Sequence, residues 1–229
     1  MTKKRLLTVL FTFLLLFTAC MVYKTPLGKG DRIIFFGDSI TQLGDKPGGY
    51  VTIVRDSINA KYKGLGIDVI GAGISGNKVP DLIARLDRDV LSKNPSIVVI
   101  YIGINDVWHY DLGIGGTPKD KFEAGLKEII GKISDKGAKV ILCTPSVVGE
   151  RSDSLNKIDP MLNEYADISR KVAGELNIRL VDLRKAFLAY EAVNNPKQLH
   201  ESILTRDAVH LNNNGNKFVA QLMLEALEQ

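Results

Sequence analysis

The stretch RIIFFGDSITQLG, residues 32–44, decides the fold of this chain. It begins as a short, almost continuously apolar run that ends at Gly37, and a different pattern opens with Asp38 and Ser39. A strand buried on both faces of a sheet, followed by a sharp turn into a helix, has this kind of sequence. Ser39 therefore stands at a strand-to-helix turn, where it is either an ordinary helix start or a reactive group.

Four more runs rich in Val and Ile follow along the chain. They are IDVIG from Ile67, SIVVIYIG from Ser96, AKVILCTP from Ala138 and IRLVDL from Ile178. Apolar residues at the three- and four-residue spacing of helices recur in residues 48–62, 79–93, 119–137, 159–176 and 215–228. This alternation predicts an α/β domain of three layers, α/β/α, around a five-stranded, mostly parallel sheet.

The N-terminus has the pattern of an export signal. Three basic residues within the first five precede an uncharged run of 14 residues, from Leu6 to Ala19. That run matches the apolar part of a signal peptide and is shorter than the roughly 20 residues of a membrane-spanning helix. We therefore expect the protein to be exported, with a plain secretory signal or an uncleaved anchor as the alternatives to the lipoprotein signal described next.

The stretch LFTAC, which ends at Cys20, resembles a bacterial lipobox, although Phe17 replaces the usual leucine. We expect residues 1–19 to form a lipoprotein-type signal peptide and residues 20–30 to form a tether. The folded domain is expected at residues 31–229. A lipid on Cys20 would anchor the protein to a membrane of the bacterial cell envelope.

The net charge and the number of cysteines bear on nucleic-acid binding and on disulfide formation. Removing the leader, which holds three bases and no acid, lowers the formal net charge from +4 to +1. A nucleic-acid surface needs clustered Lys and Arg on the folded domain, so we expect no nucleic-acid partner. The remaining cysteine, Cys143, ends one of the expected strands, and we expect it to be a small buried residue without a disulfide partner.

Polar residues gather where the apolar runs end. Ligands of parallel α/β sheets bind beyond the carboxyl ends of the strands. The residues found there are Gly37, Asp38 and Ser39 after the first run, GAGISGN with Gly76 after the second, GIND with Asn105 after the third, and RDAVHLN with Asp207 and His210 beyond the fifth. One edge of the sheet is thus predicted to collect a hydroxyl, glycines, an amide, an acid and an imidazole.

These residue types fit nucleophilic catalysis by a serine. A serine hydroxyl becomes a nucleophile when a neighbouring base takes its proton. Asp207 and His210 are three positions apart, so on one turn the acid can bind one ring nitrogen and leave the other to face Ser39. The backbone N–H groups of Ser39 and Gly76 and the side-chain amide of Asn105 are candidate donors to an oxyanion. Taken singly, Gly76 and Asn105 are better explained by turns, and an Asp-x-x-His pair often occurs by chance or caps a helix.

The four blocks together resemble the SGNH hydrolases, also called the GDSL esterase/lipase family. GDSI holds Ser39, GISGN holds Gly76, GIND holds Asn105, and DAVH holds Asp207 and His210. The blocks occur in the order of the family and span nearly the whole expected domain. Two departures leave the chemistry intact: Ile40 replaces a leucine, and Ala208 stands where a glycine is frequent.

The resemblance implies a flavodoxin-like fold and hydrolysis of carboxylic esters through an acyl-enzyme, with no metal or other cofactor. It implies Ser39 as the nucleophile, His210 as the base and then the acid, and Asp207 as the residue that orients His210. It also implies an oxyanion hole formed by Ser39, Gly76 and Asn105.

Several neighbours of these blocks have open roles. Asp38 and Asp106 are expected to accept hydrogen bonds at turns and helix starts rather than to react. Trp108, with His109 and Tyr110 beside it, forms either a wall of the substrate site or part of the domain surface. Arg206 either touches substrate or faces water, and His200 is expected in a solvated loop.

Two other classes of protein fit parts of the pattern. A metal-dependent phosphoesterase would use the acids, the amide and the histidine as ligands, but such sites usually draw on several histidines, and two of the three here lie outside the blocks. A binding module without activity can share the fold. Among esterases, the short polar loops favour small acyl groups, such as acetyl on a sugar. A lysophospholipase or lipase acting on longer chains is the alternative.

Overall fold

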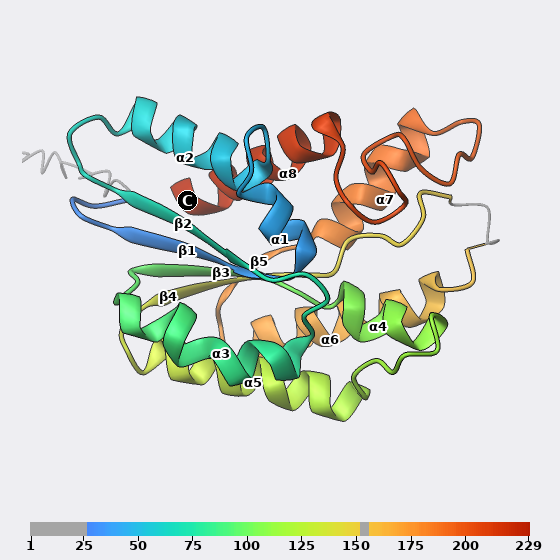
Figure 1. The fold of residues 1–229 in the computed structure, drawn as a ribbon, viewed down its shortest axis with the longest axis horizontal. Coiled ribbons are helices and arrows are strands. Elements are labelled where there is room, and N and C mark those ends of the chain that lie inside the picture. Colours follow the sequence, from blue (N-terminus) through green and yellow to red (C-terminus); the bar gives the residue numbers. More distant parts are fainter. Residues whose placement is uncertain (1–26, 152–155) are drawn as a thin grey trace, which may run out of the picture.

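The computed structural model describes residues 27–151 and 156–229. Five strands form one sheet: β1 Arg32–Gly37, β2 Asp68–Gly73, β3 Ile97–Tyr101, β4 Lys139–Cys143 and β5 Arg179–Val181. Every neighbouring pair is parallel, and the order is β2-β1-β3-β4-β5. The doubly wound order of a flavodoxin-like sheet is the same, so the predicted fold is confirmed (Figure 1).

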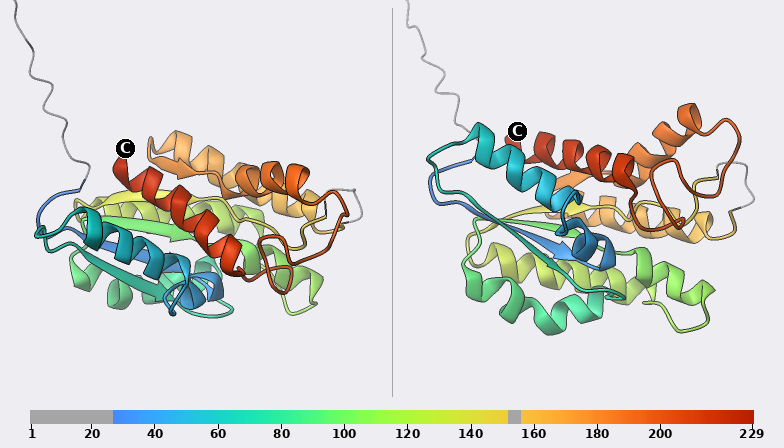
Figure 2. Two further views of the ribbon diagram at one scale, coloured as in Figure 1. Left: turned by 90° about the horizontal axis from the view of Figure 1, so that it is seen from above. Right: turned by 45° about the horizontal axis from the view of Figure 1, so that its top comes forward.

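Helices cover both faces of the sheet (Figure 1). One layer holds α1 Ser39–Gly44, α2 Tyr50–Lys61, α7 Leu183–Asn194 and α8 Asn213–Glu228, and the other holds α3 Val79–Asp89, α4 Ile104–Asp111, α5 Lys119–Ser134 and α6 Asp159–Glu175. A 3₁₀ turn, Leu91–Lys93, follows α3. In Figure 2, α2 and α8 lie side by side on one face.

The central strands are buried because helices cover both of their faces. Ile33, Ile34, Phe35 and Phe36 of β1 have no exposed surface, and every residue of β3 is buried. The Tyr50 ring packs edge-on against Phe35, with 5.6 Å between ring centroids. Strands that must be apolar on both faces read as continuous apolar runs, which is why their sequences predict them so clearly.

A close approach between β2 and α1 sets the position of Ser39. A Cβ at Gly73, the last residue of β2, would lie 2.1 Å from the backbone nitrogen of Gln42 in α1. No side chain fits there, so a glycine is required for α1 to pack against the end of β2. The helix that carries Ser39 is thereby held at the carboxyl edge of the sheet.

The structure refines several predicted boundaries. Strand β5 is only three residues long and pairs with the last three residues of β4, and α4 was not predicted as a helix. The predicted signal peptide, residues 1–19, and Cys20 lie outside the described residues. The predicted tether, residues 20–30, needs correction at its end, because Leu27 is fully buried in the core and Gly30 donates to the carbonyl of Leu65 at 2.8 Å.

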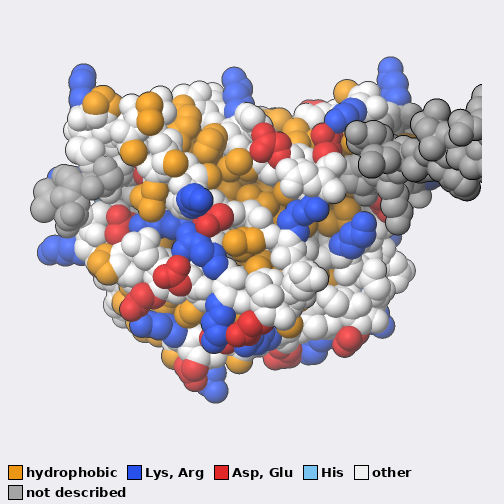
Figure 3. Space-filling view, turned by 180° about the vertical axis from the view of Figure 1, so that it is seen from behind, with side chains coloured by type: hydrophobic (Ala, Val, Ile, Leu, Met, Phe, Trp, Pro, Cys, Tyr) orange, Lys and Arg blue, Asp and Glu red, His pale blue; other side chains and the backbone are white. Residues whose placement is uncertain are grey.

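The surface opposite to the view of Figure 1 is mixed in character. Figure 3 shows hydrophobic side chains across its upper middle and charges of both signs below. Some of the protein's surface charges pair between α5 and α6, as in Lys171 with Glu123 at 2.8 Å. Among residues 27–151 and 156–229, no helix is long and apolar enough to cross a membrane.

Candidate active site

Ser39 is the first residue of α1, directly beyond the end of β1. Asp38 caps this helix, because its Oδ1 accepts the backbone N–H of Ile40 at 2.9 Å. Strand β1 lies between β2 and β3, so the segments that follow these two strands flank Ser39 on either side. The topology therefore brings Gly76 from the β2 side and Asn105 from the β3 side to the predicted nucleophile.

His210 and Asp207 come from the α7–α8 loop, residues 195–212, which reaches over the edge where β1 ends (Figure 1). His210 Nε2 lies 2.9 Å from Ser39 Oγ, and His210 Nδ1 lies 2.8 Å from Asp207 Oδ2. The backbone N–H of His210 donates to Asp207 Oδ1 at 2.7 Å. Three side chains that the sequence separates by up to 171 positions thus form one continuous line of contacts.

Asp207 is placed to hold the imidazole in one tautomer. Burial raises the pKa of Asp207, but the hydrogen bonds from the backbone and ring of His210 outweigh this effect, and the net pKa lies below its usual value. The ionised carboxylate is an acceptor only, so it binds Nδ1–H and leaves the lone pair of Nε2 for the hydroxyl of Ser39. A serine with a base oriented by an acid is the arrangement that acyl transfer requires.

The three predicted oxyanion donors belong to the segments that follow β1, β2 and β3 at the carboxyl edge of the sheet. The N–H of Ser39 belongs to the first turn of a helix, where N–H groups have no partner within the helix. Gly76 sits in an exposed turn with a φ of 78°, and nothing lies within 4 Å of the place where a Cβ would be. Asn105 is buried and uses one of its two amide N–H donors to bind the carbonyl of Asn77 at 3.0 Å.

Arg85 ties these strand ends together, although the sequence patterns did not identify it as part of the site. Its guanidinium donates to the carbonyls of Gly37 at 2.7 Å and Ala72 at 2.9 Å, and to Asn77 Oδ1 at 2.6 Å. Only 6 % of Arg85 is exposed. One buried cation therefore fixes the ends of β1 and β2 and the turn next to Gly76. The available signal was its position on the apolar face of α3, three residues after Leu82.

Two buried acids lie beneath the site without joining its line of contacts. As predicted, Asp38 caps α1, and Asp106 accepts the backbone N–H of Val79 at the start of α3 at 3.0 Å. Burial, with the charge of Asp106 as a further cause, raises the pKa of Asp38 to about 7, although the hydrogen bond from Ile40 opposes this. Burial likewise raises the pKa of Asp106 to about 6.

The raised pKa of Asp38 predicts a pH-dependent stability. In the unfolded chain an aspartate has a pKa of about 3.9, so between about pH 4 and pH 7 the folded state binds more protons than the unfolded state. The stability due to protonated Asp38 is present below pH 4 and is lost as the pH rises through 7. From pH 4 to pH 8, the free energy of unfolding of the wild type should fall by roughly 2–4 kcal/mol relative to that of Asp38→Asn, whose side chain does not titrate. Urea unfolding of both proteins across this range measures the difference, and parallel curves would contradict the shift.

Two hollows flank the segment that holds Asp207 and His210. One, of about 450 Å³, lies between α4 and the α7–α8 loop and is lined by Trp108, Asp207 and His200 among others. The second, of about 630 Å³, has polar walls that include Lys46, Arg206, Asn212 and Asn214. Arg206 also lies 3.6 Å from Asp207 Oδ2 through its Nε. Both hollows are open spaces beside the line of contacts. The walls of the second are mainly polar, whereas Trp108, Val148 and Ile158 add apolar surface to the first.

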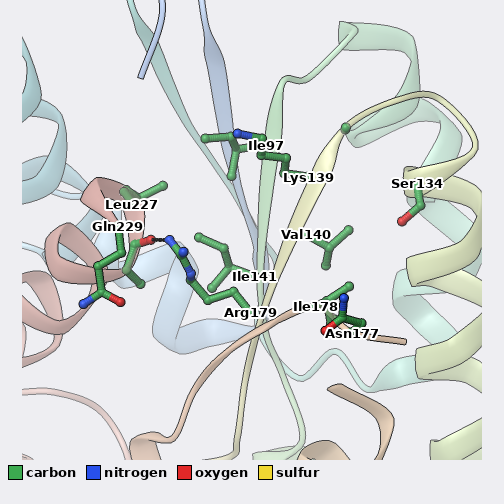
Figure 4. Close-up of a pocket in the computed structure, with 12 residues that line it drawn as sticks. Ile97, Ser134, Lys139, Val140, Ile141, Asn177, Ile178, Arg179, Leu227 and Gln229 are labelled. Atoms are coloured by element: carbon green, nitrogen blue, oxygen red, sulfur yellow. Dashed lines mark hydrogen bonds between the residues drawn. The ribbon is translucent and has the colours of Figure 1, made fainter. Parts of the chain in front are cut away.

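A third hollow, of about 480 Å³, lies at the opposite edge of the sheet. Figure 4 shows Ile97, Val140 and Arg179 around it, near the amino ends of β3, β4 and β5, with Leu227 and Gln229 from the end of the chain. It is therefore remote from Ser39. In the described part of the chain, no cluster of three or more His, Cys, Asp or Glu side chains could hold a metal ion.

Other predicted residues have simpler surroundings. Cys143 is fully buried at the end of β4, and burial raises the pKa of its thiol. His200 is exposed, as expected of a loop residue. Ala208, which stands where a glycine is frequent, has a φ of 66°, so the turn between Asp207 and His210 does adopt the left-handed conformation that glycine favours.

Comparisons with known proteins agree with this geometry. The model of the GDSL-like Lipase/Acylhydrolase family matches residues 35–218. The chain is 34% identical to an acetylxylan esterase of Geobacillus stearothermophilus over 88% of its own length and 95% of that protein. A crystal structure of an acetyl xylan esterase superposes with a TM-score of 0.83 and 49% identity, covering 85% of this chain and 98% of the other. An uncharacterized lipoprotein of Bacillus subtilis (strain 168) is 28% identical over 77% of this chain and 80% of its own length.

Proposed function

The chain belongs to the GDSL-like Lipase/Acylhydrolase family and is a carboxylic ester hydrolase, and from this premise we propose that it removes acetyl groups from carbohydrate. The observation that carries the proposal is the line of contacts from Asp207 through His210 to Ser39 Oγ. The mainly polar hollow beside Arg206 and Asn212 suits a hydroxylated substrate better than a long acyl chain. Two similar proteins named as acetylxylan esterases support the same substrate class.

The first half of the reaction forms an acyl-enzyme. Ser39 Oγ attacks the carbonyl carbon of the ester while His210 Nε2 takes the hydroxyl proton. The oxyanion that forms accepts hydrogen bonds from the N–H groups of Ser39 and Gly76 and from the amide of Asn105. The C–O bond to the sugar then breaks, and the imidazolium gives its proton to the leaving sugar oxygen.

The second half of the reaction releases acetate. A water molecule attacks the acyl carbon, and His210 Nε2 takes one of its protons. When the second tetrahedral species collapses, the bond to Ser39 Oγ breaks and the proton returns to the serine. Asp207 keeps its negative charge throughout and stabilises the imidazolium at each stage.

A panel of esters tests the proposed substrate class. We expect kcat/KM to fall steadily from acetyl to butyryl to octanoyl p-nitrophenyl esters, because the mainly polar hollow beside Arg206 and Asn212 offers little apolar surface to a longer chain. Acetylated xylooligosaccharides should be hydrolysed with a higher kcat/KM than p-nitrophenyl acetate, since the sugar adds contacts. Initial rates with each ester, measured beside Ser39→Ala as the blank, give these ratios.

The same panel identifies the alternative functions. A preference for chains of about eight carbons or more would contradict the proposal and favour a lipase or lysophospholipase. Equal rates on sugar esters and simple acetate esters would support a short acyl group in the substrate but contradict a carbohydrate as the group that carries it. Hydrolysis of phosphate esters that a chelator abolishes would instead indicate a metal-dependent phosphoesterase.

We further propose that the enzyme is exported and held at a membrane of the bacterial cell envelope by a lipid on Cys20. The motif LFTAC supports this placement, as does the similarity to the Bacillus subtilis lipoprotein. The tether that precedes Leu27 would let the folded domain stand away from the membrane surface.

Replacing Cys20 by serine tests the anchor. In a bacterial host fed an alkyne-labelled fatty acid, the wild type should carry the label and sediment with membranes, because one cysteine holds the lipid. Cys20→Ser should lose the label, and Cys143→Ser, the matched control, should keep it. A wild type that stays unlabelled, with residues 1–19 still present by mass spectrometry, would indicate an uncleaved anchor instead.

A further inference from the structure

Glu150 is a buried acid that neither the motif blocks nor the proposed mechanism uses. It follows β4 in the loop of residues 144–151 and has no exposed surface. An ionised carboxylate is costly to bury unless hydrogen bonds compensate for the lost water. The partners of Glu150 therefore show why the fold accommodates it.

Three backbone N–H groups of the α7–α8 loop donate to the Glu150 carboxylate. Oε2 accepts from Ile203 at 2.7 Å, and Oε1 accepts from Leu204 and Thr205 at 2.6 Å each. These are short, charge-assisted hydrogen bonds, which are stronger than bonds between neutral groups. Consecutive N–H groups that converge on one anion fix the conformation of the segment that supplies them.

The segment that Glu150 holds leads directly into the active site. Thr205 forms an antiparallel bridge with Leu211, and the N–H of Arg206 donates to the carbonyl of His210 at 2.8 Å. Asp207 and His210 thus lie in a small closed turn whose base is the segment bound to Glu150. A shift of residues 203–205 would move this turn relative to Ser39.

Main-chain contacts beside Glu150 hold the same turn. The N–H of Gly149 donates to the carbonyl of Ala208, between Asp207 and His210, at 2.7 Å. The N–H of Glu150 donates to the carbonyl of His200 at 2.9 Å, and the carbonyl of Glu150 accepts from the side chain of Asn195 at 2.7 Å. The loop that follows β4 is therefore bonded to the α7–α8 loop at several points along its length.

A second buried acid, Glu191 of α7, lies close enough to interact with Glu150. Burial, and then the charge of Glu150, raise the pKa of Glu191 to about 8. At neutral pH Glu191 therefore keeps its proton. The three N–H donors of residues 203–205 bind the carboxylate of Glu150 and not that of Glu191.

We propose that Glu150 is a positioning residue of the esterase, whose carboxylate fixes residues 203–205 and thereby sets Asp207 and His210 against Ser39. The inference rests on the catalytic roles proposed for these three residues. It assigns to an acid outside the motif blocks the task of keeping His210 Nε2 within hydrogen-bonding distance of Ser39 Oγ.

The test compares Glu150→Gln with Glu191→Gln, which makes the same change at the same depth. In Glu150→Gln the amide nitrogen that replaces one carboxylate oxygen cannot accept, so at least one N–H of residues 203–205 loses its partner. Displacing catalytic groups by about 1 Å costs roughly 100-fold. We expect kcat for p-nitrophenyl acetate to fall by about 10- to 100-fold in Glu150→Gln with KM within about threefold, and to change little in Glu191→Gln.

Hydrogen exchange separates positioning from general stability. In Glu150→Gln, amides of residues 203–205 should exchange faster while amides of β1 and β3 keep the wild-type rate. A kcat within twofold of the wild type would overturn the proposal, and so would a loss of kcat accompanied by faster exchange across the whole sheet.

The wild type supplies a test that needs no variant to fold. The amides of residues 203–205 should be the most protected of the α7–α8 loop, and rapid exchange there would overturn the proposal even if Glu150→Gln proved insoluble. The exchange measurement is independent of substrate. A wild type without ester hydrolysis would therefore count against the proposed function, whereas unprotected amides would count against Glu150.

Discussion

Ser39→Ala is expected to lower kcat for p-nitrophenyl acetate by roughly 10⁴- to 10⁶-fold, because the residue supplies the atom that carries the acyl group. The fold should survive the change. Ser39 Oγ bonds to His210, and the net value of such a hydrogen bond is about 1 kcal/mol. The free energy of unfolding in urea, measured beside the steady-state rates, should therefore stay within about 1 kcal/mol of the wild type.

A matched control is Ser57→Ala, which removes a partly buried serine hydroxyl that donates to the carbonyl of Ile53 in α2. Its activity should equal that of the wild type within about twofold, since Ser57 lies outside the site. A serine-directed phosphonate should label the wild type and Ser57→Ala but not Ser39→Ala. Turnover retained by Ser39→Ala would contradict the nucleophile assignment, and its loss on adding a chelator would point to a metal-dependent phosphoesterase.

The sheet and most helices could be predicted because buried faces require apolar residues at a regular spacing in the sequence. Strands covered on both faces must be continuously apolar, and helices with one covered face must repeat at three and four residues. Strand β5 was less clearly marked, since its three residues are followed directly by the polar Asp182. Helix α4 was not predicted because its eight residues, INDVWHYD, mix buried and exposed positions too briefly to show a period.

The reacting groups of the candidate site could be predicted from the sequence, but the buried residues that position them, Arg85 and Glu150, could not. Ser39, Gly76, Asn105, Asp207 and His210 stand in short blocks whose spacing is fixed by local turns. The turns of Ser39, Gly76 and Asn105 follow strands that end at one edge of the sheet, whereas Asp207 and His210 lie in the α7–α8 loop near that edge. The distances between Ser39, His210 and Asp207 agree with the predicted site.

Arg85 and Glu150 could not be found in this way. Both bind backbone atoms of distant segments, such as the carbonyl of Gly37, 48 residues before Arg85, and the N–H of Leu204, 54 residues after Glu150. A backbone group has no side-chain identity, so the sequence of the partner segment holds no sign of the bond. The one trace of Arg85 is a charged residue placed where the helical pattern calls for a buried one, and Glu150, which lies in a loop, has no such trace.

Arg85 and Glu150 position different parts of the site. Arg85 fixes the ends of β1 and β2 and the turn beside Gly76, so it acts on the side where the oxyanion would form. Glu150 fixes the segment before Asp207, so it acts on the side of the base. The guanidinium of Arg85 donates to carbonyl oxygens, and the carboxylate of Glu150 accepts from N–H groups. Each buried side chain is thus hydrogen-bonded to backbone atoms of the complementary type.

Asp207→Asn is expected to lower kcat by roughly 10⁴-fold while leaving KM nearly unchanged. In the wild type, Oδ1 accepts the backbone N–H of His210 and Oδ2 accepts from the His210 ring. Asparagine offers one oxygen and one NH₂ group at these two places. The backbone N–H can only donate, so the amide oxygen must stay with it and the NH₂ group must face Nδ1 of the ring.

That placement forces the wrong tautomer on His210. With a donor against it, Nδ1 must accept, so the ring proton moves to Nε2, which then has no lone pair to take the proton of Ser39. The ¹⁵N shifts of the His210 ring should show protonated Nδ1 in the wild type and protonated Nε2 in Asp207→Asn. Glu201→Gln, an exposed acid of the same loop, is the control and should keep wild-type activity. A kcat for Asp207→Asn within tenfold of the wild type, or an unchanged tautomer, would mean that Asp207 does not orient the base.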